Sequence, residues 1–149
     1  MTTELVNKAM GSLLGLAIGD ALGTTLEFKA RDHYTPLTDM VGGGPFKLKA
    51  GEWTDDTSMA LCLAESLLAC KRHDPVDQLR RYLRWRDEGD NSVTGRCFDI
   101  GRTVDQALQN FKRDQQAYPG CQDDFSAGNG SLMRLAPIAL FYSTHVSRR

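Results

Sequence analysis

The segment from Glu4 to Leu22 constrains this chain most, because it combines a strongly apolar pattern with glycines spaced four residues apart. Its apolar residues recur at helical spacing and cover most of the helix surface, so the segment is predicted to form a nearly buried helix. Gly11, Gly15 and Gly19 fall on one stripe of that helix. Each glycine costs about 1 kcal/mol relative to alanine inside a helix. Because three glycines with this cost lie on a single stripe, we expect another backbone to approach closely there, as in tight helix packing.

The rest of the chain also has a helical pattern. A helix start is predicted at Pro75, with Asp74 as its N-cap, and Pro137 is expected to kink the last helix. Residues 24–51 contain a triple glycine and two prolines and are expected to be irregular. No segment alternates as a half-buried strand does, so the predicted fold class is all-α, in one domain over residues 1–149. The further predicted helices cover residues 55–71, 75–87, 99–111 and 131–142.

Charge and cysteine content narrow the class of partner. Lys and Arg total 18 and Asp and Glu total 19, for a net charge of -1, so neither a nucleic-acid partner nor a polybasic membrane contact is expected.

The longest apolar stretch, about 15 residues ending at Gly23, contains Asp20 and is interpreted as too short and too polar to span a membrane. No cleavage site typical of a signal peptide follows it. The four cysteines lack CxxC spacing, which argues against a zinc ribbon or a disulfide framework and favours a cytoplasmic location.

The sequence Gly-Glu-Trp-Thr-Asp-Asp-Thr-Ser-Met at residues 51–59 stands where a loop becomes a helix. One interpretation is helix capping, with Thr54 as N-cap and two acidic residues in the first turn, where the helix dipole favours anions. The other is a cation site. The oxygens of Thr54, Asp55 and Asp56 suit Mg²⁺ or Mn²⁺ rather than Zn²⁺. The motif by itself leaves both interpretations open.

Two single carboxylates are further candidates. Glu27 follows the sequence Gly-Asp-Ala-Leu-Gly at residues 19–23, where a helix is expected to end, and could act as a general acid or base. Asp99 lies between Phe98 and Ile100 at the start of a weakly helical segment. It is either an N-cap or a carboxyl in an apolar pocket, whose pKa would be raised so that it holds a proton at neutral pH.

A glycine-rich turn precedes the last apolar segment. Residues 128–134 read Gly-Asn-Gly-Ser-Leu-Met-Arg. If this turn leads into a helix, its free backbone N–H groups would form a cradle for an anion. Arg134 would then support a phosphate, or would be a solvated residue of the first helical turn.

Four sequence blocks, in this order, resemble the ADP-ribosylglycohydrolase family, which includes the dinitrogenase reductase-activating glycohydrolases. They are GSLLGLAIGDALG with the following EF, GEWTDDTSM, GRCFDIG, and GNGSLMR with the following LAPIAL, and they extend from roughly residue 10 to residue 141. The resemblance implies an all-helical bundle with two Mg²⁺ or Mn²⁺ ions in a central cleft. It also implies hydrolysis of the bond between C1 of a ribose and a modified side chain, commonly arginine and in some members serine. The expected partner is an ADP-ribosylated protein or ADP-ribose.

The resemblance also implies roles for individual residues. The predicted metal ligands are Thr54, Asp55 and Asp56. The predicted catalytic residues are Glu27, beside the reacting ribose, and Asp99, as acid or base. The residues expected to line the ADP-ribose cleft are Gly95, Asn129, Gly130, Ser131 and Met133.

The chain departs from the family in its length. Family members are usually about twice as long, and their second half carries an Asp-x-Asp-Thr block that completes the metal pair; no such block follows residue 141. We therefore expect a truncated, N-terminal half of the bundle with half of the metal ligands. Its partners are expected to be a missing C-terminal half or further copies of the chain. The alternative function is an inactive ADP-ribose-binding or structural remnant.

Overall fold

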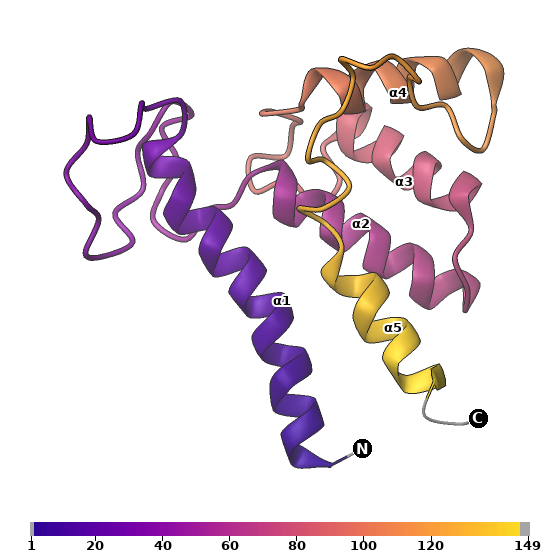
Figure 1. Cartoon of the computed structure of the whole chain (residues 1–149), viewed down its shortest axis with the longest axis horizontal. Helices are drawn as coiled ribbons and strands as arrows, with labels where there is room; N and C mark the ends of the chain where they lie inside the picture. Colours follow the sequence, from indigo (N-terminus) through magenta and orange to yellow (C-terminus); the bar gives the residue numbers. More distant parts are fainter. Residues whose placement is uncertain (1, 147–149) are drawn as a thin grey trace.

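The computed structural model describes residues 2–146, and the regular structure of this part is helical (Figure 1). No strand forms within it, and one isolated antiparallel bridge joins Gly43 and Leu48. The predicted all-α class is therefore confirmed. The helices are α1 (Thr3–Gly23), the short 3₁₀ helix η1 (Thr24–Leu26), α2 (Asp55–Cys70), α3 (Pro75–Glu88), α4 (Arg102–Asp114) and α5 (Ala136–Val146).

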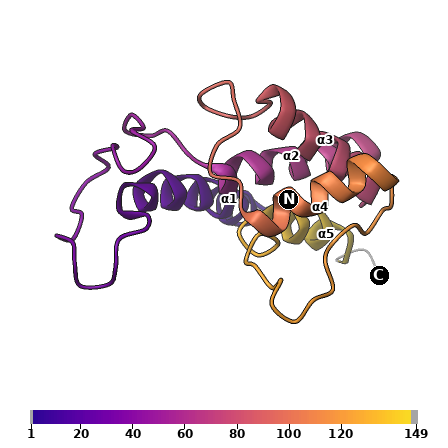
Figure 2. The same cartoon turned by 90° about the horizontal axis from the view of Figure 1, so that it is seen from above.

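Helix α2 forms the centre of the fold. It packs against α1, α3 and α5, and α4 packs against α3. Both views place most of the irregular segment between η1 and α2 on the opposite side of the molecule from α4 (Figure 1, Figure 2). The buried hydrophobic cluster consists of Met59, Cys62, Leu63 and Leu67 of α2, Tyr82 and Trp85 of α3, and Leu108 of α4.

The start of α3 follows the local signals in the sequence. The side chain of Asp74 accepts hydrogen bonds from the backbone N–H groups of Val76 and Asp77, and Pro75 occupies the first helical position. Gly89 ends the helix in the left-handed conformation, with a φ of 83°. The predicted N-cap is therefore confirmed. It could be predicted because Asp74 and the two N–H groups from which it accepts lie within three residues of one another.

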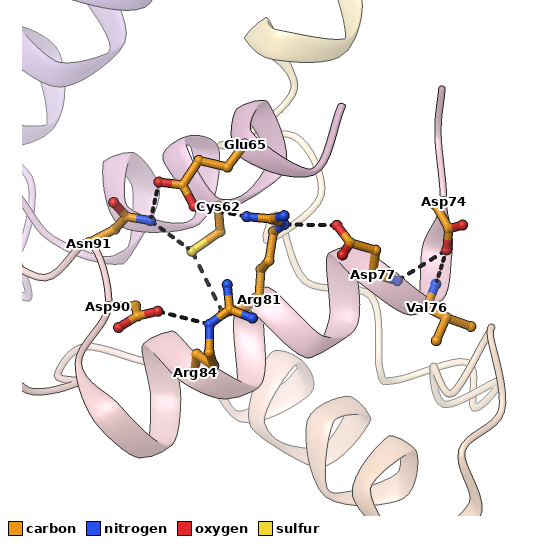
Figure 3. Close-up of polar contacts among 9 residues, drawn as sticks. All are labelled: Cys62, Glu65, Asp74, Val76, Asp77, Arg81, Arg84, Asp90 and Asn91. Carbon is orange, nitrogen blue, oxygen red and sulfur yellow. Dashed lines mark hydrogen bonds and ion pairs between the residues drawn. The ribbon is translucent and has the colours of Figure 1, made fainter. Parts of the chain in front are cut away.

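A polar network joins α2 to α3 and to the loop that follows α3 (Figure 3). The side-chain amide of Asn91 donates to Cys62 Sγ at 3.4 Å and to Glu65 Oε1 at 3.3 Å. Arg81 bridges Glu65 and Asp77 through ion pairs. These contacts fix the beginning of the loop that carries Asp99 against the side of α2.

Helix α1 differs from its prediction. Its position in the sequence is as expected, but Ala21 is its only buried residue, so the prediction of a nearly buried helix is wrong. No heavy atom of a packed neighbour lies within 4 Å of where a Cβ would stand at Gly11, Gly15 or Gly19. Among the described helices, α1 packs toward α2, α5 and η1, and Figure 1 shows it along one edge of the molecule. The glycine stripe therefore meets no second backbone among the described residues.

Two helix starts lie later than predicted. The N-cap of α4 is Gly101, and Asp99 precedes it with a φ of 59°, so the interpretation of Asp99 as an N-cap is wrong. Helix α5 begins at Ala136, which places Pro137 in its first turn, where proline starts a helix without kinking it. The turn at residues 128–134 therefore does not open a helix directly. The N–H groups of Leu132 and Met133 instead bond to the carbonyl of Asn129.

One stretch, Thr3–Leu26, is long and apolar enough to cross a membrane by length and composition. The sequence argument that this region is too short to span a membrane is therefore not supported. A core helix and a signal sequence near the N-terminus pass the same test, and 11% of this stretch is buried. All four cysteines are free.

Candidate functional site

The start of α2 is held by an aspartate from α1. Both carboxylate oxygens of Asp20 lie 3.0 Å from the backbone nitrogen of Thr54, and Oδ2 also accepts from the backbone nitrogen of Thr57 at 3.0 Å. The hydroxyls of Thr54 and Thr57 donate to the same carboxylate at 2.7 and 2.6 Å. Thr54 occupies the N-cap position, but its side chain makes no capping hydrogen bond. Thr54 is therefore the N-cap residue by position, as predicted, but Asp20 rather than the Thr54 side chain accepts the hydrogen bonds from the start of the helix.

Sequence reasoning did not select Asp20 as a site residue, although it singled out the surrounding glycines. The contact joins residues 34 positions apart, so no local capping pattern reveals it. The available signal was an aspartate inside an otherwise apolar helix. A carboxylate in such a position needs hydrogen-bond donors or a cation nearby.

Two further carboxylates follow Thr54 in the first turn of α2. Burial raises the pKa of Asp55 to about 7, and the negative charges of Asp56 and Asp20 add to the effect. Burial also raises the pKa of Asp56, together with the charges of Asp20 and Glu27. The dipole of α2 favours these negative charges, but their mutual repulsion and desolvation outweigh it.

Glu27 and Asp99 come together from two separate loops. Burial raises the pKa of Asp99 to about 8, and the charges of Asp55 and Glu27 and a hydrogen bond with Glu27 raise it further. Rings next to these carboxylates form a short aromatic chain. Phe46 lies 6.2 Å from Phe28 and 5.3 Å from Phe98, between ring centroids. The segment after η1 is thereby packed against the loop before α4, with the two acidic groups side by side.

A pocket of about 410 Å³ opens at this cluster. Its polar wall includes Asp20, Glu27 and Asp56, and Gly19 and Gly23 of α1 form part of its rim. The remaining lining residues are Thr24, Leu26, Lys29, Tyr34 and Thr54. Asp55 and Asp99 do not line this pocket, but Asp55 interacts electrostatically with Asp56, and Asp99 with Glu27 and Asp55. We call the pocket, together with these two neighbouring carboxyl groups, the acidic pocket.

The residues predicted to bind ADP-ribose lie on two other loops, which flank the start of α4. Gly95 has a φ of 68° and its carbonyl lies against Gly89. A Cβ at Gly130 would stand 2.7 Å from a methyl group of Val104 in α4. Asn129 and Ser131 are exposed, whereas Met133 packs against the hydrophobic core.

Arg134 is a packed residue. Its guanidinium lies 4.7 Å from the centre of the Tyr82 ring, and Nη1 lies 3.4 Å from the sulfur of Met59. The interpretation of Arg134 as a solvated residue of a first helical turn is therefore wrong. The cation and the ring face attract each other, which fixes the end of the glycine-rich turn on the core.

The donor chemistry around Thr54 suits a hard cation, but the arrangement is incomplete. Within residues 2–146 no three carboxylate, imidazole or thiol side chains are grouped so that they could hold a metal ion. The residues present in this part of the chain therefore do not make up a metal site by themselves. The hydroxyl of Thr54 donates its hydrogen to Asp20 at 2.7 Å and keeps its lone pairs for a cation that further residues would hold.

An all-helical domain with paired carboxylates at a helix start agrees with one known family. The chain belongs to the ADP-ribosylglycohydrolase family, whose sequence pattern it matches over residues 1–148. It is 53% identical over 138 residues to the ADP-ribosylarginine hydrolase Tri1 of Pseudomonas putida, covering 93% of this chain and 37% of that protein. It is 49% identical over 146 residues to the ADP-ribosylarginine hydrolase Tri1 of Serratia proteamaculans, covering 98% and 40%.

A solved structure, described as an ADP-ribosylglycohydrolase-related protein complex, has the same fold. It matches with a TM-score of 0.79 and 43% sequence identity, over 93% of this chain and 44% of that chain. The chain thus spans about two fifths of the length of the relatives that it matches. It corresponds to their N-terminal portion.

Proposed function

We propose that this chain supplies the N-terminal part of an ADP-ribosylarginine hydrolase, which removes ADP-ribose from modified arginine side chains. One observation carries the proposal: the acidic pocket gathers Glu27, Asp56 and Asp99 in a chain about half identical to two ADP-ribosylarginine hydrolases. The four free cysteines support a cytoplasmic location as part of the same proposal.

The electrostatics of the acidic pocket suit acid–base chemistry. With a pKa of about 8, Asp99 holds its proton at neutral pH. It can therefore donate that proton to the guanidine nitrogen as the bond from this nitrogen to C1 of the ribose breaks. Water adds to C1, and a second carboxylate, Glu27, takes up the proton that the water loses. Arginine and ADP-ribose are then released.

The loops around α4 are proposed to bind the remainder of the substrate. Asn129 and Ser131 are exposed and carry polar groups that can reach a diphosphate or ribose. Thr54, Asp55 and Asp56 are proposed to contribute oxygen ligands to a Mg²⁺ or Mn²⁺ site that further residues complete. No catalytic step described above depends on that cation.

The test is release of ADP-ribose from an arginine-ADP-ribosylated protein, with Mn²⁺ or with a chelator. If the chain or a complex containing it is active, Asp99→Asn and Glu27→Gln should each lower the rate by about 10²- to 10⁴-fold. The matched control is Asp90→Asn, because Asp90 is a half-exposed surface carboxylate paired with Arg84. Equal rates for Asp99→Asn and Asp90→Asn would contradict the catalytic assignment.

A second candidate is binding of ADP-ribose without hydrolysis. The incomplete set of metal-ligating side chains among the described residues favours it. Titration calorimetry with ADP-ribose distinguishes the two candidates. Binding that persists with chelator, without product release in any complex, would support the second candidate and contradict the first.

A further inference from the structure

A second cavity, of about 440 Å³, lies between α3, α4 and the loop that follows α4. Tyr82 of α3, Ala107 of α4 and Pro119 of the loop all line it. The side-chain amide of Asn110 donates to the carbonyl of Pro119 at 3.1 Å, which ties the loop to α4. A cavity of this volume can enclose a small organic molecule. We call it the α3–α4 pocket.

The α3–α4 pocket is separate from the acidic pocket. The acidic pocket lies at the start of α2, whereas the α3–α4 pocket includes Pro75, the first residue of α3, which follows the end of α2. The two ends of the 16-residue helix α2 lie about 24 Å apart. Figure 1 shows α3 beginning near the far end of α2. No described residue lines both cavities, so the α3–α4 pocket needs an explanation of its own.

Arg134 lines the α3–α4 pocket without a carboxylate partner. Its guanidinium contacts the Tyr82 ring, 4.7 Å from the ring centre, and the sulfur of Met59, 3.4 Å from Nη1. Among the described residues it forms no ion pair, and none of those that line the pocket carries a carboxyl group. A guanidinium has five N–H donors, and a sulfur atom and a ring face leave most of them without a strong acceptor.

A chain of hydrogen bonds brings a further donor to the same pocket. Gln78 Oε1 lies 2.9 Å from Nε2 of His73, and Gln78 Nε2 donates to the Tyr82 hydroxyl at 2.9 Å. Burial raises the pKa of Tyr82 to about 12, so this hydroxyl keeps its hydrogen at neutral pH. The Tyr82 side chain is almost completely buried, and no described residue accepts that hydrogen. A buried donor without an acceptor is costly, and a ligand oxygen in the pocket would remove this cost.

We propose that the α3–α4 pocket binds a small organic monocarboxylate, whose carboxylate accepts hydrogen bonds from Arg134 and Tyr82 while its apolar part lies against Leu79 and Ala107. A planar carboxylate matches the paired N–H groups of a guanidinium, and such charged pairs are stronger than neutral hydrogen bonds. Arg134 is the one lysine or arginine among the described lining residues, so it balances a single negative charge. A phosphate group, with a charge between about −1.5 and −2 at pH 7, would be left partly unbalanced.

The experiment is a titration of the purified chain followed by two-dimensional NMR, which gives both the affinity and the location of the bound molecule. The probes are benzoate, 3-phenylpropionate and 4-methylpentanoate, each compared with its uncharged amide. At least one acid is expected to bind with a dissociation constant of about 1 mM or lower, and its amide at least about tenfold more weakly. The backbone amide signals of the residues that line the α3–α4 pocket should shift, whereas those of Asp20 and Glu27 should not.

Two substitutions test the assigned donors. Arg134→Gln should weaken binding of the acid at least about tenfold, because it removes the charge and the paired N–H groups. Tyr82→Phe, which removes only the hydroxyl group, should weaken it about three- to tenfold. The matched control is Arg80→Gln, at an exposed arginine of α3 that does not line the pocket, and it should leave the affinity unchanged.

A further variant guards against misfolding of Arg134→Gln, since that guanidinium also packs on Tyr82. Ala107→Leu fills the α3–α4 pocket and leaves both donors in place. Because leucine also favours a helix, the circular dichroism should be unchanged while binding is lost. Equal affinity for an acid and its amide, or binding that tolerates Arg134→Gln or Ala107→Leu, overturns the proposal. Failure of all three acids to bind overturns it as well.

ADP-ribose separates this proposal from the proposed function, on which it does not rest. A saturating concentration of ADP-ribose is expected to leave the affinity for the acid unchanged. Displacement of the acid by ADP-ribose would assign the α3–α4 pocket to the substrate of the proposed function and overturn the separate carboxylate site. A chain that binds the acid as described but neither binds nor releases ADP-ribose contradicts only the hydrolase assignment.

Discussion

Helices α1 and α2 are both apolar and both carry part of the acidic pocket, yet they differ completely in burial. In α2, the residues Met59, Cys62, Leu63 and Leu67 are all at most 3% exposed. In α1 only Ala21 is buried. The difference lies in the neighbours, because α3 and α5 cover α2, whereas one side of α1 is covered by no other helix among the described residues. An apolar helical pattern therefore predicts that burial would stabilise a helix. Whether the helix is buried depends on which other elements pack against it.

The two helices are nevertheless joined at one point. Asp20, near the end of α1, holds the start of α2 through four different donor groups. The position of the acidic pocket thus depends on a helix that has a single buried residue. The contribution of this exposed helix to stability can be compared with that of α2 by matched substitutions.

The largest contrast is expected from the same substitution in the two helices. Leu67→Ala removes a side chain that is 2% exposed in the core and should lower the free energy of unfolding by about 2–5 kcal/mol. Leu14→Ala, at a residue that is 54% exposed, should change it by about 0.5 kcal/mol or less in the isolated chain. Urea unfolding followed by circular dichroism measures both. Equal losses would show that α1 is buried in solution, for example against another copy.

The pH dependence of stability should come from the region where the helices meet. The pKa values of Asp55 and Asp99 rise from an ordinary value of 3.8 to about 7 and about 8. The folded chain therefore binds protons more tightly than the unfolded chain, and the stability present below pH 4 is lost as pH rises through about 8. Each pKa unit corresponds to about 1.4 kcal/mol, so the buried Asp55 alone should account for a loss of about 2–3 kcal/mol between pH 5 and pH 7. Partial solvent screening of Asp99 limits what this second group adds.

The control for this pH effect is Asp99→Asn, which removes one of the two titrating groups. Denaturant unfolding at pH 5, 6, 7 and 8 should give a flatter profile for the variant than for the original chain. A chain that becomes more stable from pH 5 to pH 8 would have the opposite sign, and would contradict the burial of these carboxyls.

A smaller effect is expected from the two capping aspartates. Asp74 caps α3 from its own chain neighbourhood, and Asp74→Ala should cost about 1 kcal/mol. Asp20→Ala should cost about 2 kcal/mol, because two backbone N–H groups and two hydroxyls lose their acceptor. The comparison is best made by urea unfolding near pH 5, where protonation of Asp55 limits the repulsion that Asp20→Ala relieves. A cost for Asp20→Ala below that for Asp74→Ala would contradict the long-range cap.

These caps also show which parts of the molecule the sequence predicts. The start of α3 is encoded in adjacent residues, since Asp74 accepts from groups two and three positions away, and its prediction is confirmed. The cap of α2 is not local, because its acceptor lies on α1. Thr54 was a plausible local cap, and only the folded arrangement shows that its hydroxyl donates to Asp20 instead.

In the candidate site too, some features could be predicted from the sequence and others depend on the folded arrangement. The ordered blocks identified the family, and the structure places Glu27 and Asp99 together. Neither periodicity nor capping rules could predict the left-handed φ of 59° at Asp99, or the contacts of Phe46 with Phe28 and Phe98 that join the two loops. Such contacts depend on the tertiary arrangement of irregular segments. The roles of the predicted metal ligands and substrate-binding residues stay predictions.

The smallest change in stability is expected from a glycine substitution in the exposed helix α1. Gly15→Ala places a methyl group where no neighbour stands within 4 Å, so it should stabilise the free chain by about 0.5–1 kcal/mol through the higher helix propensity of alanine. Gly89→Ala is the contrasting control, because its φ of 83° and the adjacent carbonyl of Gly95 leave no room for a Cβ. Thermal unfolding of the free chain should move upward for Gly15→Ala and downward for Gly89→Ala. A downward shift for Gly15→Ala would show that the space beside Gly15 is filled in solution, for example by another copy of the chain.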